Sequence, residues 1–344
     1  MSSYLVSVLT LGAVTVTLAL GLNLQYGWAG DLNLAYYGFV ALGAYICGVV
    51  VLPKGNPAQG ASWILGLHQS FVVGAISAAV VAAVAGLAIG SVALRRVTGD
   101  YFAIVTLSVT LIFWTFSDQF APMFNGAEGI FGVQPAFGGV LHLSYNSYGQ
   151  FLLGICLAVM VIVIIVFEVL YRSPFARTLR AVRDDPVSAS AFGISPYRRK
   201  LVAFVLGSAV AGLGGALIVE YVTAFSPAGW SPVETFLLFS GIIVGGVGSV
   251  WGVFFGASVV LIGVPQMTLF IPAPGGDTTF LPALHDLIIG FIILAFLYLR
   301  PRGVFPEKSP QLGPDNTLRW QSRLVQAIAA RARKPRELVG DEPA

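Results

Sequence analysis

The sequence predicts an all-α, polytopic membrane protein with about 8–10 transmembrane helices, some of them broken or half-length. Hydrophobic residues make up 56% of the 344 positions and charged residues only 10%. Soluble domains usually carry about 25% charged residues, so the composition excludes an ordinary soluble protein. Several uncharged apolar runs contain about 20 residues, the length that crosses a hydrocarbon core of about 30 Å.

These apolar runs define the expected helices. The first run has no basic region before it and no small-residue cleavage site, so we expect a retained helix and not a signal peptide. Cys47 and Cys156 lie inside apolar runs, where we expect small buried hydrophobic side chains and no disulfide. In chain order, the runs cover residues 4–22, 33–52, 63–94, 102–116, 151–170, 201–222, 234–262 and 284–299.

Basic residues orient these runs in the membrane. All but one of the 19 Lys and Arg residues fall in four clusters, at 95–96, 172–200, 300–308 and 319–336. The positive-inside rule assigns all four clusters to the cytoplasm. The largest cluster fills the long polar segment 171–200, which we expect to be a cytoplasmic loop because lipid does not accommodate such a density of charge.

Two stretches are expected to be broken helices. Three unbroken crossings between Lys200 and Arg300 would leave Arg300 outside, so we expect run 234–262 to break at its glycines, GGVGSVWG (245–252). The alternative is one tilted helix followed by a poorly marked span at 264–271. The segment NLQYGWAGD (23–31) is too polar for lipid. Whether or not it belongs to a broken helix decides on which side of the membrane the N-terminus lies, and the sequence leaves this open. Paired breaks in two halves of a chain indicate a translocation site.

Small residues and two aspartates predict local contacts. Asp31 and Asp100 each follow a glycine and precede an apolar run, so we expect helix N-caps, with substrate contact as the alternative. Small residues at every fourth position predict close helix packing. These ridges are Gly74, Ala78, Ala82, Gly86 and Gly90; Gly207, Ala211 and Gly215; and Gly241, Gly245 and Ser249.

Residues 1–305 are expected to form the transmembrane domain, and residues 306–344 a cytoplasmic tail. The tail is rich in proline and charge, and either an amphipathic helix on the inner leaflet or a disordered tail fits it. The sequence contains no phosphate-binding loop and no zinc-type histidine spacing. We therefore expect no catalytic residues, no metal and no cofactor in this chain, and no nucleic acid among its partners.

The segment SPFARTLRAVRDDPVSASAFGISPYRRKLVAF (173–204) resembles the cytoplasmic loop of permease subunits of branched-chain amino acid (LIV-type) ABC importers, in their second-permease branch. Further matches extend from about residue 11 to residue 305. They include GLNLQYGWAGDLNLAYYGFVALGAY (21–45), TGDYFAIVTLSVTLIF (98–113) and GGVGSVWGVFFGA (245–257). These segments in this order are specific to the family, whereas a match to segment 245–257 alone would be weak.

The resemblance implies an ABC importer permease bundle that pairs with a homologous second permease in the bacterial cytoplasmic (inner) membrane. It also implies two cytoplasmic ATPase subunits, which bind ATP and Mg, and a periplasmic or lipid-anchored substrate-binding protein. The implied function is ATP-driven import of branched-chain or other hydrophobic amino acids by alternating access. A urea or short-amide importer is the main alternative, and an ion-coupled secondary transporter is a remote one.

The resemblance further implies a short coupling helix at about 186–192 that docks on an ATPase and ends at Gly193. Family loops commonly carry a glutamate near Ser188 and Ser190, so the serines leave the detail of this contact open. The family's outer-loop T-G-G motif reads NGAEG (125–129), which weakens any inference about substrate from that loop. The expected coupling residues are Arg183, Asp184, Asp185, Pro186, Ser188, Ser190, Ala191, Phe192 and Gly193.

The two broken stretches are the expected translocation pathway, at the interface with the second permease. A zwitterionic substrate needs opposed partial charges, which the ends of broken helices supply without a buried ion. Either this chain or the binding protein sets specificity. The expected pathway residues are Asn23, Gln25, Asp31, Gly245, Gly246, Gly248 and Ser249.

Overall fold

A computed structural model describes residues 3–55, 63, 65–97, 99–133, 145–268, 280–300 and 303–307. Contacts within the chain divide it after Glu307, and the structure described here is that of the first unit. The predicted helix in the tail lies outside the described residues. Helices make up nearly all of the regular structure of the described part, and this confirms the all-α prediction.

Seven segments of the described part are long and apolar enough to cross a membrane. Two shorter apolar helices add to these: α2 (Tyr36–Val51), and residues Leu287–Leu299 of α14 (Phe280–Leu299). The long segments include five helices: α1 (Ser3–Asn23) with its π-helical extension η1 (Leu24–Trp28), α3 (Phe71–Arg96), α4 (Asp100–Gln119), α7 (Tyr145–Arg172) and α10 (Pro196–Val222). The remaining two comprise η4 (Pro227–Gly229) with α11 (Val233–Gly245), and α12 (Val250–Ala257) with η5 (Ser258–Gly263) and α13 (Val264–Thr268).

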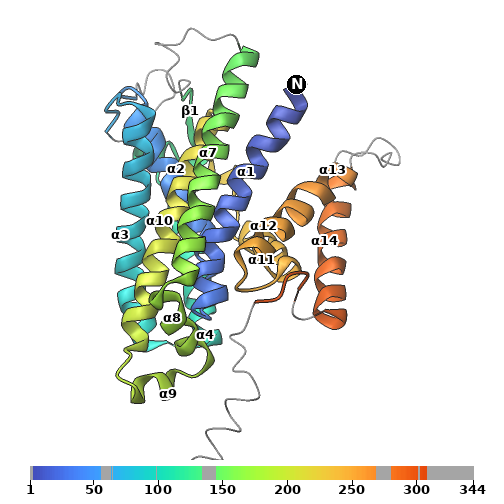
Figure 1. Ribbon diagram of the computed structural model, residues 1–344. Helices are drawn as coiled ribbons and strands as arrows, with labels where there is room; N and C mark the ends of the chain where they lie inside the picture. The colour runs from blue at the N-terminus through green and yellow to red at the C-terminus, as the bar shows by residue number, and fades with distance from the viewer. Residues whose placement is uncertain are drawn as a thin grey trace, which may run out of the picture. The chain divides into compact units, whose positions relative to one another are not determined.

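The connection after α4 folds at the same end of the bundle as Ser3. It contains α5 (Ala121–Phe124), η3 (Gly126–Glu128) and β1 (Ile130–Phe131). β1 pairs antiparallel with β2 (Ala224–Phe225), with Ile130 opposite Phe225. The other end of the bundle carries the arm formed by α8 (Pro174–Asp184) and α9 (Pro186–Ala191) (Figure 1).

Helix α10 lies at the centre of the helical bundle, where it packs against α2, α3 and α1 (Figure 1). Small residues make these contacts possible; Ala82 and Gly215 belong to the predicted ridges, whereas Gly212 does not. A Cβ on Gly212 would lie 2.5 Å from the Ala82 Cβ of α3, and one on Gly215 would lie 2.8 Å from the backbone nitrogen of Ala44 in α2. These helices therefore approach at backbone distance, as small residues permit in membrane bundles.

Run 234–262 is broken, as predicted. Helix α11 ends at Gly245, the chain turns through Gly246 and Gly248 with φ of +127° and +84°, and α12 begins at Val250. Such backbone angles favour glycine. The two helices pack against each other, with Gly245 opposite Gly252. The alternative of one unbroken tilted helix is wrong, and the second arm continues through a π-helical turn to Thr268.

The first predicted break lies between η1 and α2. Helix α1 continues through η1 to Trp28, and residues 29–35 return the chain to the start of α2 at Tyr36. α1 therefore crosses the whole bundle, whereas α2 is a shorter helix. Ser3 and the α8–α9 arm lie at opposite ends of the bundle (Figure 1).

Replacing Gly215 with alanine should destabilise the bundle. The added methyl would overlap the carbonyl of Val40 and crowd Ala44, and overpacking of this kind costs about 1–3 kcal/mol. The purified variant should therefore unfold at a lower temperature in detergent. Gly154→Ala is the matched control, because nothing lies within 4 Å of the added atom. An equal melting temperature for Gly215→Ala and the wild type would contradict this account of the packing.

Candidate functional site

A polar arm between α7 and α10 carries the predicted coupling residues. It consists of α8 (Pro174–Asp184) and α9 (Pro186–Ala191), each of which begins with a proline. Proline suits this position, where the backbone N–H has no helical partner. α8 buries Ala176, Leu179 and Val182 and contacts α7, α10 and η1. The base of the arm is thus packed onto the bundle.

The short helix α9 has a well-defined start and end. The Asp185 carboxylate accepts hydrogen bonds from the Ser188 hydroxyl at 2.5 Å and from the backbone N–H groups of Ser188 and Val187 at 3.2 and 2.9 Å. These bonds hold the pKa of Asp185 below its usual value. After the helix, Gly193 adopts a φ of +78°. A short helix thus occupies the predicted segment and ends before Gly193.

The tip of the arm exposes two large hydrophobic side chains. Val187 is 80% exposed and Phe192 is 85% exposed, although the surrounding segment is polar. The predicted coupling residues Asp184, Ser188, Ser190 and Ala191 are exposed around them. Exposed apolar side chains rimmed by polar groups are typical of protein contact surfaces. The tip can therefore bind another protein chain.

Arg183 points away from the tip and toward the bundle. Its Nη1 lies 3.0 Å from Glu307 Oε2 and also donates to the carbonyl oxygen of Gly27, while its Nε donates to Asp184 at 3.1 Å. Burial opposes the charge of Arg183, but Glu307 and Asp184 hold the pKa of the guanidinium above its usual value. Within this chain, then, Arg183 joins the arm to the first helix break.

Arg180, Arg183 and Glu307 form an ion cluster, here called the arginine–glutamate node. Arg180 Nη1 lies 3.1 Å from Glu307 Oε1, and the Arg180 guanidinium stacks over the ring of Tyr171 at 4.5 Å. The side chains of Arg180 and Glu307 are only 15% and 16% exposed. Charges withdrawn from water to this extent contribute only when paired, and here one carboxylate bridges two guanidinium groups.

The two helix breaks meet at a second cluster, here called the break junction. The Gly248 N–H donates to Asn23 Oδ1 at 2.9 Å, and the Trp28 indole donates to the Gly248 carbonyl at 2.9 Å. A Cβ on Gly27 would lie 2.7 Å from the Gly248 nitrogen. The two segments, more than 200 residues apart in sequence, therefore satisfy each other's backbone groups.

The segment Gly303 to Glu307 connects the node to the break junction. Val304 and Phe305 donate backbone hydrogen bonds to the carbonyls of Val244 and Gly245, at 3.0 and 2.9 Å. These carbonyls close α11 and would otherwise have no helical partner. Glu307 Oε2 lies 2.8 Å from the position of a Cβ on Gly248. The arm, both breaks and the chain after α14 thus meet around one carboxylate.

The remaining predicted pathway residues are bonded inside the chain. Gln25 donates to the Phe204 carbonyl and accepts from Asn33, both at 2.8 Å. Ser249 caps α12 by accepting from the Gly252 N–H at 3.1 Å. The structure therefore brings Asn23, Gly246, Gly248 and Ser249 to one place. Gln25 and Asp31 instead contact α10, through Phe204 and Lys200.

The predicted aspartate caps are wrong. Asp31 forms an ion pair with Lys200 of α10 at 2.5 Å, and the residue before α2 is Ala35, which offers no side-chain cap. The nearby lysine satisfies a buried carboxylate better than free backbone N–H groups do. Asp100 lies within the first turn of α4, after Gly99, and makes no capping bond.

Sequence patterns did not reveal the node. Glu307 and Arg180 are 127 residues apart, and each stands among other charged residues in a polar segment. No local spacing distinguishes them from solvated charges. The exposed position of Val187 could have been predicted from the sequence, because it is a large apolar side chain in a charged loop.

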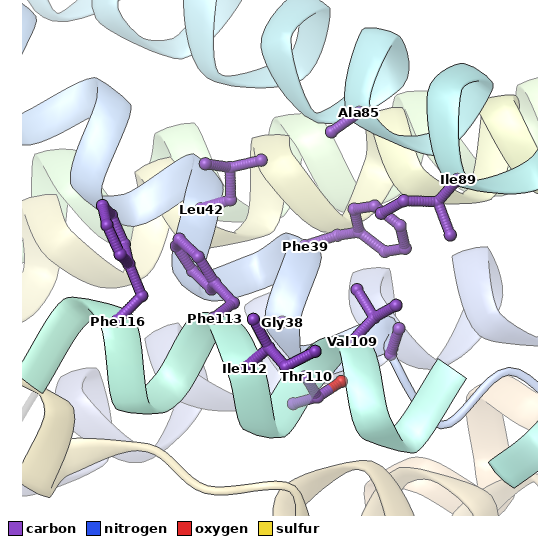
Figure 2. Close-up of a pocket in the computed structure, with 11 residues that line it drawn as sticks. Gly38, Phe39, Leu42, Ala85, Ile89, Val109, Thr110, Ile112, Phe113 and Phe116 are labelled. Carbon is purple, nitrogen blue, oxygen red and sulfur yellow. The ribbon is translucent and has the colours of Figure 1, made fainter. Parts of the chain in front are cut away.

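A cavity of about 330 Å³ lies between α2, α3 and α4 (Figure 2). Its walls are hydrocarbon, formed by side chains such as Phe39, Ile89, Phe113 and Phe116. The hydroxyl of Thr110 bonds to the Leu34 carbonyl at 3.2 Å. This cavity suits an aliphatic or aromatic group and supplies no charged partner for a zwitterion.

Comparisons with known proteins agree with the resemblance. A family model described as the permease component of branched-chain amino acid transport systems matches residues 4–297. The high-affinity branched-chain amino acid permease protein LivM of Escherichia coli K12 is 28% identical over 327 residues, which covers 89% of this chain and 71% of that protein. A probable LivM of Methanocaldococcus jannaschii is 26% identical, covering 84% and 90%. The probable LivH of the same organism is 27% identical, covering 84% and 87%. No solved structure is significantly similar.

Replacing Glu307 with glutamine should destabilise the chain. The change leaves two partly buried guanidinium groups without their shared carboxylate, at a cost of about 1–3 kcal/mol. A lower melting temperature of the purified protein would show this. Glu168→Gln is the matched control, since its pair with Arg172 is exposed and worth at most about 1 kcal/mol. Equal melting temperatures for the two variants would contradict the role given to the node.

Proposed function

This chain belongs to the family of permease components of branched-chain amino acid transport systems, and we propose that it is the membrane-spanning permease of an ATP-driven importer of branched-chain or other hydrophobic amino acids. Its apolar helices make it a multi-pass membrane protein. The relatives named above are branched-chain amino acid permeases, and none of them is named for urea, amides or ion coupling. The chain acts as a transport component and not as an enzyme.

The observation that carries this proposal is the construction of the α8–α9 arm. Its tip exposes Val187 and Phe192. Its base is bonded through Arg183 to Gly27 in the first helix break and to Glu307, whose segment closes the end of α11. A free loop would need neither feature. An arm that is gripped at its tip and fixed at its base transmits displacement into the bundle. We assign the partner that binds the tip to a cytoplasmic ATPase subunit, one of two that bind ATP and Mg.

This assignment gives the chain an orientation. The basic residues on and beside the arm favour the cytoplasmic side of the bacterial inner membrane. Ser3 then lies outside, and the chain after α14 lies in the cytoplasm. A homologous second permease completes the pathway within the membrane. A periplasmic or lipid-anchored binding protein delivers substrate at the outer end, near β1 and β2.

We propose the following mechanism. Closure of the ATPase dimer moves the tip of the arm, and α8 moves with it because its apolar face is packed on the bundle. Arg183 and Glu307 pass this movement to Gly27 and to the end of α11. The break junction then rearranges, and access alternates between the two sides as packed elements shift between discrete arrangements. The path would open beside the residues predicted for it: Asn23, Gln25, Asp31, Gly245, Gly246, Gly248 and Ser249.

Reconstitution tests the function directly. With its second permease, ATPases and binding protein in proteoliposomes, the chain should support ATP-dependent uptake of radiolabelled leucine and not of urea. Arg183→Ala should still assemble and hydrolyse ATP, but leucine taken up per ATP should fall about tenfold, because the arm loses a charged hydrogen-bond connection of about 1.4 kcal/mol or more. ATP-driven uptake of urea without leucine would refute the assignment, and an unchanged ratio in Arg183→Ala would refute the mechanism.

Crosslinking tests the partner of the arm. Ser188→Cys places a thiol on the exposed side of α9, and both native cysteines are buried. A short bifunctional thiol reagent should join this variant to an ATPase subunit that carries a cysteine in its docking groove. Ser147→Cys serves as the control and should give no such product, because Ser147 is exposed at the start of α7, the end of that helix that is remote from the arm. Absence of the Ser188 product in an assembled, active complex would contradict the coupling role of α9.

A further inference from the structure

A second cavity, of about 380 Å³, lies between α1, α2, α10, α11 and η5, and it differs in chemistry from the one in Figure 2. Glu234, Tyr37 and Thr15 are the polar residues that line it. Its other walls are mostly aliphatic, and include Ile218, Leu237 and Leu261. The volume falls within the range of roughly 300–1,000 Å³ typical of small-molecule sites.

With the break junction at one face of the hydrocarbon core, the length of α11 would place Glu234 near the middle of the membrane. It stands in the first turn of α11, whose other end, Gly245, adjoins the break junction. Eleven residues of helix span about 16 Å, roughly half of a 30 Å hydrocarbon core. Helix α2 also begins at this level, since the Tyr37 N–H donates to the Thr235 hydroxyl at 3.2 Å. Two helices thus start side by side inside the bilayer, next to the cavity.

A carboxylate at this depth indicates function. Acidic side chains inside membranes face a protein interior or a water-filled space, and they commonly mark substrate or ion pathways. By contrast, the exposed side chains of α7 between Leu157 and Val169 are all aliphatic, as lipid contact requires. The mouth of the Glu234 cavity should therefore open on the translocation path or the second permease and not on lipid.

We propose that this cavity binds the transported amino acid, with Glu234 pairing with its ammonium group and the aliphatic walls holding its side chain. The positive ends of the α2 and α11 dipoles lie at the same level and favour the substrate carboxylate. The inference rests on the proposed import of branched-chain amino acids. It replaces the earlier expectation that helix ends alone, without a buried ion, accommodate the zwitterion.

The carboxylate also accounts for selection against neutral compounds. A charge-assisted hydrogen bond in a partly buried site is stronger than one between neutral groups. Urea and short amides have no cationic group to pair with Glu234. The aliphatic walls add affinity in proportion to the apolar area that the substrate buries, about 25 cal/mol per Å². Together these features select an ammonium group joined to a branched hydrocarbon.

Glu234→Gln tests the site in the complete transporter. In proteoliposomes with saturating binding protein, the initial rate of leucine uptake should fall at least about tenfold, the equivalent of a lost charged hydrogen bond. Glu234→Asp should retain part of the rate. Glu168→Gln is the matched control, because that carboxylate pairs with Arg172 at an exposed position.

A second variant separates binding from a merely structural role of Glu234 at the start of α11. Leu237→Phe should narrow the cavity, so the rate of leucine uptake should fall several-fold more than that of alanine. Wild-type leucine uptake by Glu234→Gln, or equal losses for leucine and alanine in Leu237→Phe, would overturn the inference and leave the proposed function intact. Failure of the wild-type complex to transport leucine would instead overturn the proposed function.

Discussion

The shared carboxylate of Glu307 holds this structure's moving parts together. Arg180 and Arg183 both bind it from the arm, and its own segment closes the end of α11 through Val304 and Phe305. Arg183 adds a bond to Gly27, in the first helix break. Buried ion clusters contribute little net stability compared with apolar packing, but they fix which groups meet. Here the cluster fixes the relative positions of three segments that are far apart in sequence.

Helix α11 gives this cluster a mechanical consequence. Its C-terminal end is held at the break junction, and its first turn carries Glu234 in the mid-membrane cavity. A helix of this length behaves as a rigid rod, because each turn is closed by its own hydrogen bonds. On the proposed mechanism, displacement of the arm would reach the cavity along one element. Small residues at the α11–α12 contact, such as Gly241 and Gly245, let the two helices approach at backbone distance.

Local sequence rules predicted the features that depend on neighbouring residues. Apolar runs predicted the spans, and the glycines of 245–252 predicted the break. The short helix of the arm, which ends before Gly193, was expected from the family resemblance and not from a local rule. The rules failed where the partner is distant. Asp31 was expected to cap a helix, yet Lys200 from α10 binds it. The sites of Glu307 and Glu234 could not be predicted either, because the residues that surround each of them come from segments that are distant in sequence and meet only in the folded chain.

The two arginines of the node differ in their bonds. Both guanidinium groups share the Glu307 carboxylate, and Arg183 also pairs with the exposed carboxylate of Asp184 at 3.1 Å. Arg183 further donates to the Gly27 carbonyl, at the negative end of the long α1–η1 helix. If the arm withdraws Arg183, Arg180 still binds Glu307 and remains stacked on Tyr171. The connection to the first break is therefore separable, while the connection to α11 is retained. On the proposed mechanism, the arm would release the first break while it stays attached to the segment that closes α11, so the two breaks would respond differently to the same movement.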